Sequence, residues 1–470
     1  MAFALNIRAP AGAARASTSR SAQSVVMQSR TVRAPQQQRR TNVVVKAKEN
    51  GYMVKSAGHV ATGGEENPGS PEVQAMINSG GRLPGGKKKT AIITGASSGL
   101  GLHTAKVLVK TGDWNVICAV RDKKKMEKMA QALEFPKGSY TIEEVDLKSL
   151  KSVRNLCNRL TAPIGGAAGF DCVLGNAAVY YPMLKDPEKF RLGFHMAGAG
   201  ALAANRMGSE ARVSEDGFEE SAAVIHLSHF LMFNLLLPAV ERHGRKTDTK
   251  PRMIIVGSIT HNPTELAGKI PPVANLGDCR GLFEGFKVED GITMVDGGRF
   301  DGPKAYKDAK ACNMMTIFEM HNKFHESTNI TFNTMYPGCI AETPLFRNHY
   351  PAFQKLFPAF QKYITGGYVG VEEAGERLAS VCCDPDYSKS GCYWSWAGGV
   401  RGANGSTQSY NKKENGLGGK FENRVSKEVA NSDLCKKVWE GSMIAVGLEG
   451  EPRIVGKQEG NIFSKLFAKV

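Results

Sequence analysis

Tyr306 and Lys310 are four residues apart in the segment AYKDAK (305–310), within a pattern that predicts a helix. Residues at positions i and i+4 of a helix lie on one face, so the phenol and the ammonium would face the same space. An unperturbed phenol titrates near ~10, and a neighbouring positive charge favours the phenolate and lowers that pKa. The pair therefore predicts a proton donor near neutral pH, although the same spacing occurs in ordinary surface pairs.

Ser258 strengthens the catalytic interpretation. It follows the apolar run MIIVG (253–257), which predicts a buried strand. Because parallel sheets bind ligands at the carboxyl ends of their strands, the hydroxyl is placed to orient a reacting group. Ser258, Tyr306 and Lys310 are therefore the first candidate catalytic residues.

A glycine-rich turn, TGASSGLG (94–101), lies between an apolar run at 91–93 and a helical pattern. Glycines permit a tight turn and close backbone approach, and a helix N-terminus offers free N–H groups and the positive end of its dipole. This order predicts a turn that binds the pyrophosphate of a dinucleotide, with a purely structural turn as the alternative. The candidate binding residues of the turn are Gly95, Ser97, Ser98, Gly99, Leu100 and Gly101.

Arg121 and Lys125 follow the second predicted strand. Sites that select NAD usually place a carboxylate here for the ribose 2′-hydroxyl, whereas a guanidinium pairs with a 2′-phosphate. Arg121 therefore predicts NADPH as the cofactor, with Lys125 adding positive charge. The alternative is a solvated basic start of the next helix, with Asp122 as its cap.

Asp146 and Asn176 follow the third and fourth predicted strands. We expect Asp146 either to accept a hydrogen bond from the adenine or to cap the helix at 149–161. Asn176 begins a segment of small residues, Asn176-Ala177-Ala178, which would let the cofactor ribose lie close. A plain turn is the alternative for this segment.

Short β-type runs alternate with amphipathic helical patterns from residue 90 onward. This alternation predicts an α/β fold with a Rossmann-type doubly wound, mostly parallel sheet and helices on both faces. We predict strands at 90–94, 114–120, 139–145, 170–175, 252–257, 330–336 and 391–395. We predict helices at 100–111, 123–133, 149–161, 218–243, 303–326 and 371–382.

Composition limits the classes of partner. The chain has 470 residues and a formal net charge of +16, part of which comes from nine basic and no acidic residues in 1–48. Without zinc-finger spacing or a basic stripe interleaved with aromatics, we expect no nucleic-acid partner. No apolar run reaches 18 residues, so we predict no transmembrane span, and we expect a buried helix at 230–237. The ten cysteines lack CxxC spacing, which predicts reduced thiols and no metal site.

The chain is predicted to hold one catalytic domain with appended segments. Residues 1–48 are rich in Ala, Ser, Thr, Arg and Gln, which predicts an organelle transit peptide, with a disordered basic tail as the alternative. Residues 49–87 predict a flexible linker, and 88–450 the catalytic domain, followed by a tail at 451–470. Two stretches, at about 183–216 and 397–420, look like insertions.

Taken in chain order, the turn at 94–101, Asn176-Ala177, Ser258, Tyr306 and Lys310 resemble the short-chain dehydrogenase/reductase superfamily. Longer segments resemble one family within it, the light-dependent NADPH:protochlorophyllide oxidoreductases, and the chain is identified as a divergent member. These segments are TAIITGASSGLGL (90–102), NAAVYYP (176–182), IIVGSIT (254–260), AYKDAKACNMM (305–315), ITFNTMYPGCIAET (330–343), FQKYITGGYV (360–369) and SGCYWSW (390–396).

The resemblance implies a light-driven step of chlorophyll biosynthesis. The excited pigment, protochlorophyllide, would accept a hydride from NADPH at its C17–C18 double bond, followed by a proton. Tyr306 would be the acid or hydrogen-bond donor, and Lys310 would hold the nicotinamide ribose. Cys339 matches a family cysteine beside the pigment and is a rival proton donor, with a packed thiol as the alternative. Thr343 would touch the nicotinamide amide.

The resemblance also implies a chloroplast location, in the stroma or attached peripherally to the plastid membrane surface, and self-association into a homo-oligomer.

One motif departs from the family. Its Asn-His-Leu-Gly-His-Phe reads IHLSHF (225–230) here, and the superfamily uses that Asn to hold a water in a proton relay. Since Ile225 cannot do so, we expect slow or altered turnover, and we expect His226 and His229 to pack within the helix.

Two other functions stay open at this point. One is a dark NADPH-dependent reductase of another hydrophobic substrate, which would use the same Ser258, Tyr306 and Lys310. The other is a non-catalytic protein that binds NADPH or pigment, which the missing Asn suggests.

Overall fold

The computed structural model describes residues 88–162, 169–182, 211–288, 291–349, 351–365, 367–396, 419–448 and 450. The predicted transit peptide, linker and C-terminal tail lie outside the described residues, as does most of each predicted insertion. The first strand begins at Lys89, one residue into the predicted catalytic domain.

Eight strands form one sheet in the order β10-β9-β8-β5-β4-β1-β2-β3. They are β1 (Lys89–Thr94), β2 (Trp114–Val120), β3 (Tyr140–Glu144), β4 (Cys172–Gly175), β5 (Arg252–Val256), β8 (Thr331–Met335), β9 (Cys392–Trp396) and β10 (Lys420–Glu422). Neighbouring strands are parallel except β9 and β10, which are antiparallel. Each of the seven predicted strands is present to within two residues at either end, and the doubly wound fold is confirmed.

The order of the strands reverses between β1 and β4. From β1 the sheet continues to β2 and β3 on one side, whereas β4, β5 and β8 extend on the other. Crossover connections on the two sides of such a point run over opposite faces of the sheet, which leaves a crevice outside the carboxyl ends of these strands. The fold therefore places the loops that follow β1 and β4 at the edges of one crevice.

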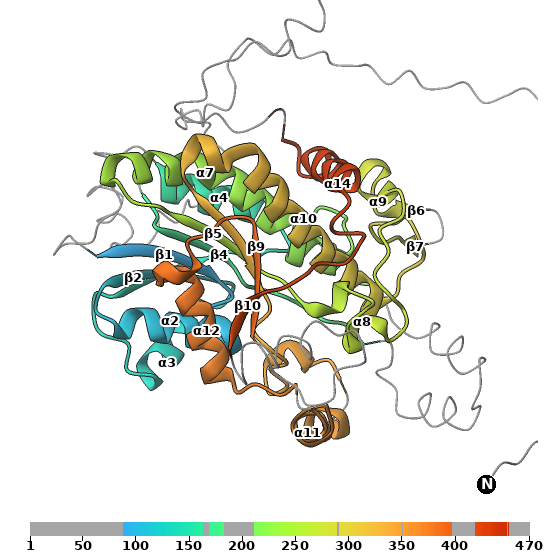
Figure 1. Cartoon of the computed structure of the whole chain (residues 1–470), viewed down its shortest axis with the longest axis horizontal. Coiled ribbons are helices and arrows are strands. Elements are labelled where there is room, and N and C mark those ends of the chain that lie inside the picture. The colour runs from blue at the N-terminus through green and yellow to red at the C-terminus, as the bar shows by residue number, and fades with distance from the viewer. Residues whose placement is uncertain are drawn as a thin grey trace, which may run out of the picture. The chain divides into compact units, whose positions relative to one another are not determined.

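Helices cover both faces of the sheet (Figure 1). One face carries α4 (Leu150–Thr161), α7 (Ser228–Thr247) and α10 (Gly302–Thr328), and the other carries α2 (Gly99–Lys110), α3 (Lys123–Ala132) and α12 (Val371–Cys383). These six correspond to the predicted helices. The structure adds α14 (Ser432–Ala445), which packs on α10 and extends the first layer.

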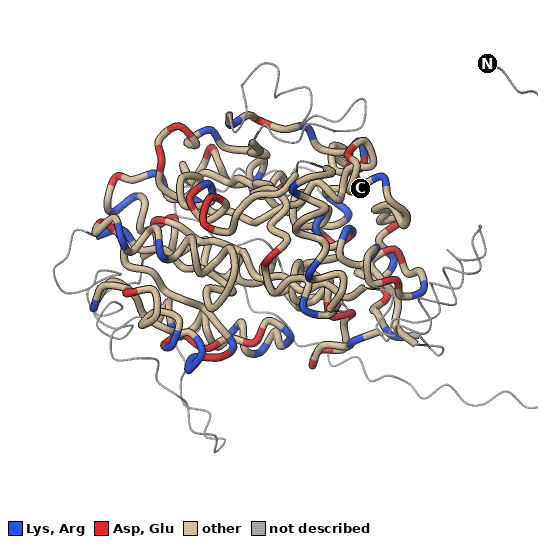
Figure 2. The backbone as a smooth tube through the Cα atoms, turned by 90° about the horizontal axis from the view of Figure 1, so that it is seen from below, with Lys and Arg blue, Asp and Glu red and all other residues tan. Residues whose placement is uncertain are grey.

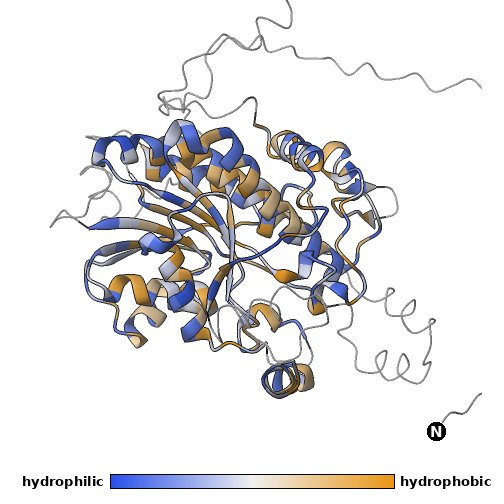
Figure 3. Cartoon of the chain, in the orientation of Figure 1, coloured by the Kyte–Doolittle hydropathy of each residue, from blue (hydrophilic) through white to orange (hydrophobic). Residues whose placement is uncertain are grey.

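Two apolar clusters join the helices to the sheet. Leu156, Phe233 and Met315 belong to the cluster under α4, α7 and α10, and Leu108 and Leu378 belong to the one under α2 and α12. Figure 3 shows hydrophobic residues on the sides of these helices that approach the sheet. The segment 222–247 is long and apolar enough to cross a membrane, but 89% of its apolar window is buried inside the protein. It is a core helix, as predicted for 230–237.

The remaining elements are short. They are the 3-10 turns η3 (Ile259–His261), η4 (Pro344–Phe346) and η6 (Pro385–Tyr387), the π-helical turns η2 (Ala222–Leu227) and η5 (Gln361–Thr365), the helices α8 (Leu266–Lys269), α9 (Arg280–Glu284) and α11 (Pro351–Phe360), and the hairpin of β6 (Lys287–Val288) and β7 (Gly291–Ile292). All ten cysteines are free thiols, in agreement with the predicted reduced state.

Basic and acidic residues are interspersed along the described chain in the view of Figure 2. The first turn of α3 differs, because it reads Lys123-Lys124-Lys125 and has no acidic residue. Arg121 lies between the last residue of β2 and Asp122, the N-cap of this helix. Positive charge is therefore concentrated next to the crevice, on the side of β2.

Candidate active site

A cavity of about 990 Å³ lies at the crevice, lined by residues that follow β1, β2, β3, β4, β5 and β8 and by residues of α10 and α11. It brings together nearly all the predicted site residues. These are Gly95, Ser97, Ser98, Gly99, Leu100, Arg121, Lys125, Asp146, Asn176, Ser258, Tyr306, Lys310, Cys339 and Thr343. Gly101 is the one predicted site residue that does not line it.

Two glycines of the turn have different tasks. Gly95 has a φ of +68°, which favours glycine, and it brings the backbone against Ala177. Gly101 permits close packing, because a Cβ there would lie 2.4 Å from Nδ2 of Asn176 and 2.8 Å from the carbonyl O of Gly95. Gly101 therefore lets α2 pack closely on Asn176 and does not itself line the cavity, and its role in binding the cofactor stays a prediction.

The N-terminus of α2 faces the cavity without a side-chain cap. Asp122 caps α3 and Ser149 caps α4, each accepting from a backbone N–H of the first turn. Ser98 stands at the equivalent position of α2 and makes no such bond. Because the first N–H groups of a helix need an acceptor, this end of α2 fits an anionic group such as a pyrophosphate.

Arg121 and Lys125 are exposed side chains at the end of the cavity next to β2. The carboxylate of Asp122 accepts from the Lys125 N–H at 2.9 Å, so Asp122 is a cap, as predicted. Asp146 is not a cap of α4, which corrects one of its two predicted roles. Its Oδ1 accepts from the Lys148 N–H at 3.0 Å, and Ser149 caps the helix.

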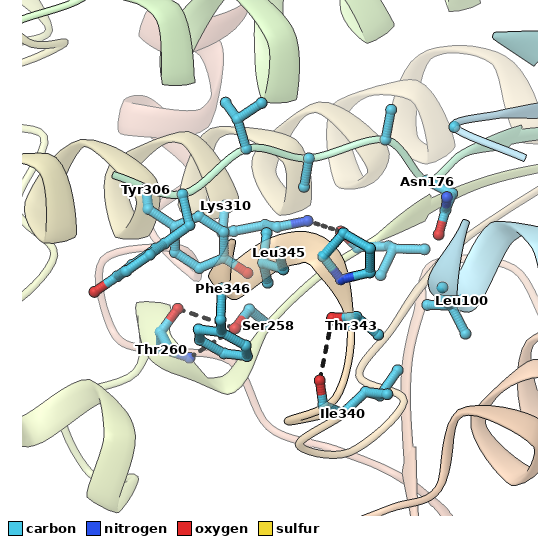
Figure 4. A pocket seen from close by; sticks show the side chains of 18 of the residues that line it. Leu100, Asn176, Ser258, Thr260, Tyr306, Lys310, Ile340, Thr343, Leu345 and Phe346 are labelled. Carbon is cyan, nitrogen blue, oxygen red and sulfur yellow. Dashed lines mark hydrogen bonds between the residues drawn. The ribbon is translucent and has the colours of Figure 1, made fainter. Parts of the chain in front are cut away.

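Tyr306, Lys310 and Ser258 meet in the cavity, where α10 faces the end of β5 (Figure 4). Burial raises the pKa of the Tyr306 phenol to about 12, against a lowering by its hydrogen bond with Ser258. Nζ of Lys310 lies 5.8 Å from the centroid of the Tyr306 ring and donates to the carbonyl O of Val256 at 2.7 Å. The prediction that Lys310 lowers the phenol pKa is therefore wrong here, because burial dominates and the opposing effect comes from Ser258.

Burial also lowers the pKa of Lys310, to about 7. A buried ammonium loses its hydration, so its neutral form becomes accessible near neutral pH. Tyr306 stays protonated at that pH and Lys310 is poised between its two forms. The site therefore holds a phenol that can donate a proton and an amine that can exchange one.

Cys339 and Thr343 lie in the loop after β8. Burial raises the pKa of the Cys339 thiol to about 12, so the thiol keeps its proton at neutral pH. That state suits a proton donor and a packed thiol equally. Oγ1 of Thr343 donates to the carbonyl O of Ile340 at 3.1 Å, and its methyl group lies close to Gly99.

Four aromatic side chains that line the cavity form an aromatic wall, which the sequence analysis did not predict. The Tyr180 ring stacks on His349 with centroids 5.4 Å apart, and His349 stacks on Phe353 at 4.0 Å. Phe353 stacks in turn on Phe357, at 4.6 Å. The available signal was the density of phenylalanines in 346–360.

Comparisons with known proteins identify the family. Residues 89–262 match the model of the short chain dehydrogenases. A chloroplastic protochlorophyllide reductase of Chlamydomonas reinhardtii is 44% identical, over 77% of this chain and 79% of its own length. Protochlorophyllide reductase B of Hordeum vulgare is 46% identical, over 78% of this chain and 81% of its own. The chain belongs to the protochlorophyllide reductase family.

Membership in the protochlorophyllide reductase family confirms several predictions. The chain is an oxidoreductase of the short-chain dehydrogenase type, and its cofactor is a nicotinamide dinucleotide. The relatives in barley, pea and Chlamydomonas are chloroplastic, which confirms the predicted plastid location.

Ile225, which the resemblance predicts to replace an Asn of the family motif, lies in the π-helical turn η2. Its side chain is fully buried in the apolar cluster and does not line the cavity, whereas that of its neighbour Val224 does. Its carbonyl O accepts a hydrogen bond from Nδ1 of His229 at 2.9 Å. A side chain at position 225 therefore points into the core in this chain.

Introducing the Asn that the resemblance predicts at position 225 should destabilise the protein without raising its rate. Ile225→Asn would bury an amide in an apolar cluster, and we expect the free energy of unfolding to fall by about 1–3 kcal/mol, or more where a cavity also forms. Denaturant unfolding measures this, with Ile225→Val as the control at about 0.5–1.5 kcal/mol. A large gain in turnover would show instead that position 225 acts in a proton relay.

Proposed function

We propose that this chain catalyses the light-driven reduction of protochlorophyllide to chlorophyllide with NADPH. A hydride adds to one carbon of the C17–C18 double bond and a proton adds to the other, which leaves NADP⁺ and a single bond. One observation supports this proposal most strongly. The glycine turn at 95–99, called the cradle below, and the aromatic wall line the same cavity. A dark reductase or a binding protein needs no light, so a light requirement separates the proposals.

The cradle supports the dinucleotide part of the proposal. β1 lies between β2 and β4, so a pyrophosphate on the turn at 95–99 would direct one half of the cofactor to each side. Arg121 and Lys125 lie on the β2 side, where a 2′-phosphate would meet positive charge, and Asn176 lies on the β4 side, towards Lys310. When bound, the reduced nicotinamide supplies the hydride.

The aromatic wall supports a flat, apolar substrate. The Tyr180 ring stacks with His349 and meets the Tyr306 ring edge-on, with centroids 5.2 Å apart. Aromatic side chains pack against other flat π-systems either offset-stacked or edge-on. A macrocycle lying on this wall would therefore have the Tyr306 phenol beside it.

Proton delivery falls to Tyr306 in this proposal. The phenol is protonated at neutral pH, and Ser258 is hydrogen-bonded to it. Lys310 is held by the carbonyl O of Val256 and can return a proton to the phenol after transfer. Cys339 is the rival donor, because its thiol is also protonated and lines the same cavity.

NADPH selectivity is assigned to Arg121 and gives a direct test. In Arg121→Asp, repulsion replaces the ion pair at the 2′-phosphate, so NADPH should bind about 10- to 100-fold more weakly. NADH, which lacks that phosphate, should be little affected. Titration of both dinucleotides measures the two dissociation constants, and equal weakening of both would remove the assignment.

Peripheral membrane attachment and self-association are also proposed. Leu356, Phe360, Tyr363 and Ile364, in α11 and η5, have exposed fractions of 68%, 49%, 73% and 51%. Exposed apolar side chains in one segment mark an interaction surface. Sedimentation with plastid-lipid vesicles tests the attachment, and light scattering of the free protein tests the self-association.

The activity itself is tested by mixing the full chain with NADPH and protochlorophyllide in darkness and then applying a flash of visible light. A red-shifted chlorophyllide absorption band that appears only after the flash would support the proposal. A shifted pigment spectrum on mixing with no product would indicate a binding protein. Neither change would indicate a dark reductase of another substrate.

A further inference from the structure

A buried hydrogen-bond chain lies behind the cofactor wall, outside the cavity. Oγ1 of Thr94, the last residue of β1, accepts from the backbone N–H groups of Asn176 at 2.9 Å and Ala177 at 3.0 Å. The same oxygen lies 2.8 Å from Nε2 of His229. Thr94 and His229 are both fully buried. The chain therefore connects η2 and α7 to the small-residue segment that follows β4.

The donors and acceptors of this chain are determined by its members. Nδ1 of His229 lies 2.9 Å from the carbonyl O of Ile225, which can only accept, so Nδ1 carries the proton. Nε2 is then an acceptor and takes the hydroxyl proton of Thr94. The only other acceptor recorded for that hydroxyl among the described residues is the carbonyl O of Leu174, at 3.5 Å. Both lone pairs of the hydroxyl receive backbone N–H groups, so Thr94 is fully engaged.

We propose that His229 is a positioning residue for the nicotinamide half of NADPH. It holds the hydroxyl of Thr94 in the one orientation that accepts both N–H groups, and so fixes Asn176 and Ala177 in the wall of the cavity. This inference rests on the proposed dinucleotide site. It gives Ile225 a task as well, because the backbone carbonyl of that residue sets the tautomer of His229.

The packing around His229 fits this role. A Cβ added at Gly175 would lie 3.2 Å from Cγ and Cδ2 of the ring, so the glycine gives the imidazole room beneath the end of β4. Burial lowers the pKa of His229 to about 4, which keeps the ring neutral and its Nε2 an acceptor at neutral pH. Nδ2 of Asn176 donates to the carbonyl O of Thr94 at 2.9 Å, a second tie between β1 and the wall.

The test compares two ligands on the full chain. NADPH occupies both halves of the site, whereas 2′,5′-ADP occupies only the half next to Arg121. In His229→Phe the ring remains but the acceptor for Thr94 is lost, so NADPH should bind about 5- to 20-fold more weakly. The affinity for 2′,5′-ADP should stay within about twofold. If His229→Phe does not fold, His229→Asn replaces it, because its shorter amide cannot reach Thr94.

His226→Phe is the matched control. His226 is equally buried in the same helical segment, but its Nε2 bonds to Ser442 of α14 at 2.7 Å, away from the cofactor wall. The variant His226→Phe should leave the ratio of the affinities for NADPH and 2′,5′-ADP unchanged. The conservative variant Thr94→Ser should leave it unchanged as well. Thr94→Val should weaken NADPH selectively, and adding His229→Phe to it should cause little further loss because both act through one hydroxyl.

Equal weakening of NADPH and 2′,5′-ADP in His229→Phe, or no weakening of either, would overturn the inference. The assay uses no pigment and no light, so it is independent of the reduction step. If the flash experiment gave no product but His229→Phe still weakened NADPH more than 2′,5′-ADP, the positioning role of His229 would be supported and the proposed reduction would not. A wild-type chain that binds neither ligand would overturn the dinucleotide site and this inference together.

Discussion

Tyr306→Phe should lower the rate of product formation per flash by about 10²- to 10⁴-fold, the range typical of a general acid. The substitution removes only the hydroxyl, and the ring that meets Tyr180 edge-on remains. Since the phenol is protonated at neutral pH, its proton is available in the wild-type protein without prior uptake. Single-flash absorption spectroscopy on the preformed ternary complex measures the effect.

The control for Tyr306→Phe is binding. NADPH and pigment affinities should remain within a few-fold, because the lost hydroxyl bonds to Ser258 and is not part of the cradle. Cys339→Ala is the companion variant, since that thiol is the rival donor. Full activity in Tyr306→Phe together with a large loss in Cys339→Ala would transfer the proton donor to the cysteine.

Acid should destabilise the protein through three buried histidines. Burial lowers the pKa of His226 to about 3 and those of His229 and His261 to about 4, from an ordinary value of 6.5. Between these values the unfolded chain binds protons that the folded chain does not, so stability is present above pH 6.5 and is lost as pH falls towards 4. Each histidine contributes at most about 1.4 kcal/mol per pH unit.

Two buried carboxyl groups act in the opposite direction. Burial raises the pKa of Glu219 and of Asp308 to about 7, so their folded forms bind protons over the same pH range. The contribution of one histidine is therefore measured by comparing the pH dependence of unfolding in the wild type and in a variant that lacks it. Urea unfolding of wild type and His226→Gln at several values between pH 4.5 and 7 should give a shallower pH dependence for the variant, by up to about 1.4 kcal/mol per unit. Parallel curves would contradict the prediction.

Local patterns were sufficient to predict most of the fold. Apolar runs bounded by turn residues located β1 to β5, β8 and β9, because strands buried on both faces need nearly continuous apolar sequence. The antiparallel strand β10 has three residues and pairs with β9, a contact that no local pattern encodes. The π-helical turn at Ala222–Leu227 was also beyond reach, since a shift from i+4 to i+5 bonds leaves the apolar periodicity of a buried helix nearly unchanged.

The sequence predicted which residues line the site better than it predicted their pKa values. The i,i+4 spacing correctly put Tyr306 and Lys310 in one cavity, but spacing carries no information about burial, which sets both pKa values. The link from His229 to Thr94 joins residues 135 positions apart. Only the packing of η2 and α7 under β1 and β4 creates it, so no motif could have predicted it.

The bare first turn of α2 has a consequence for the lifetime of the protein in the plastid. Since Ser98 does not cap that turn, a pyrophosphate bound there would supply acceptors that the chain itself leaves out. Any ligand that binds only the folded state adds to its stability, by about 2.7 kcal/mol at a hundred times its dissociation constant. Proteases that attack opened molecules would then remove the ligand-free population first, which would couple the amount of the protein to the supply of the dinucleotide, oxidised or reduced.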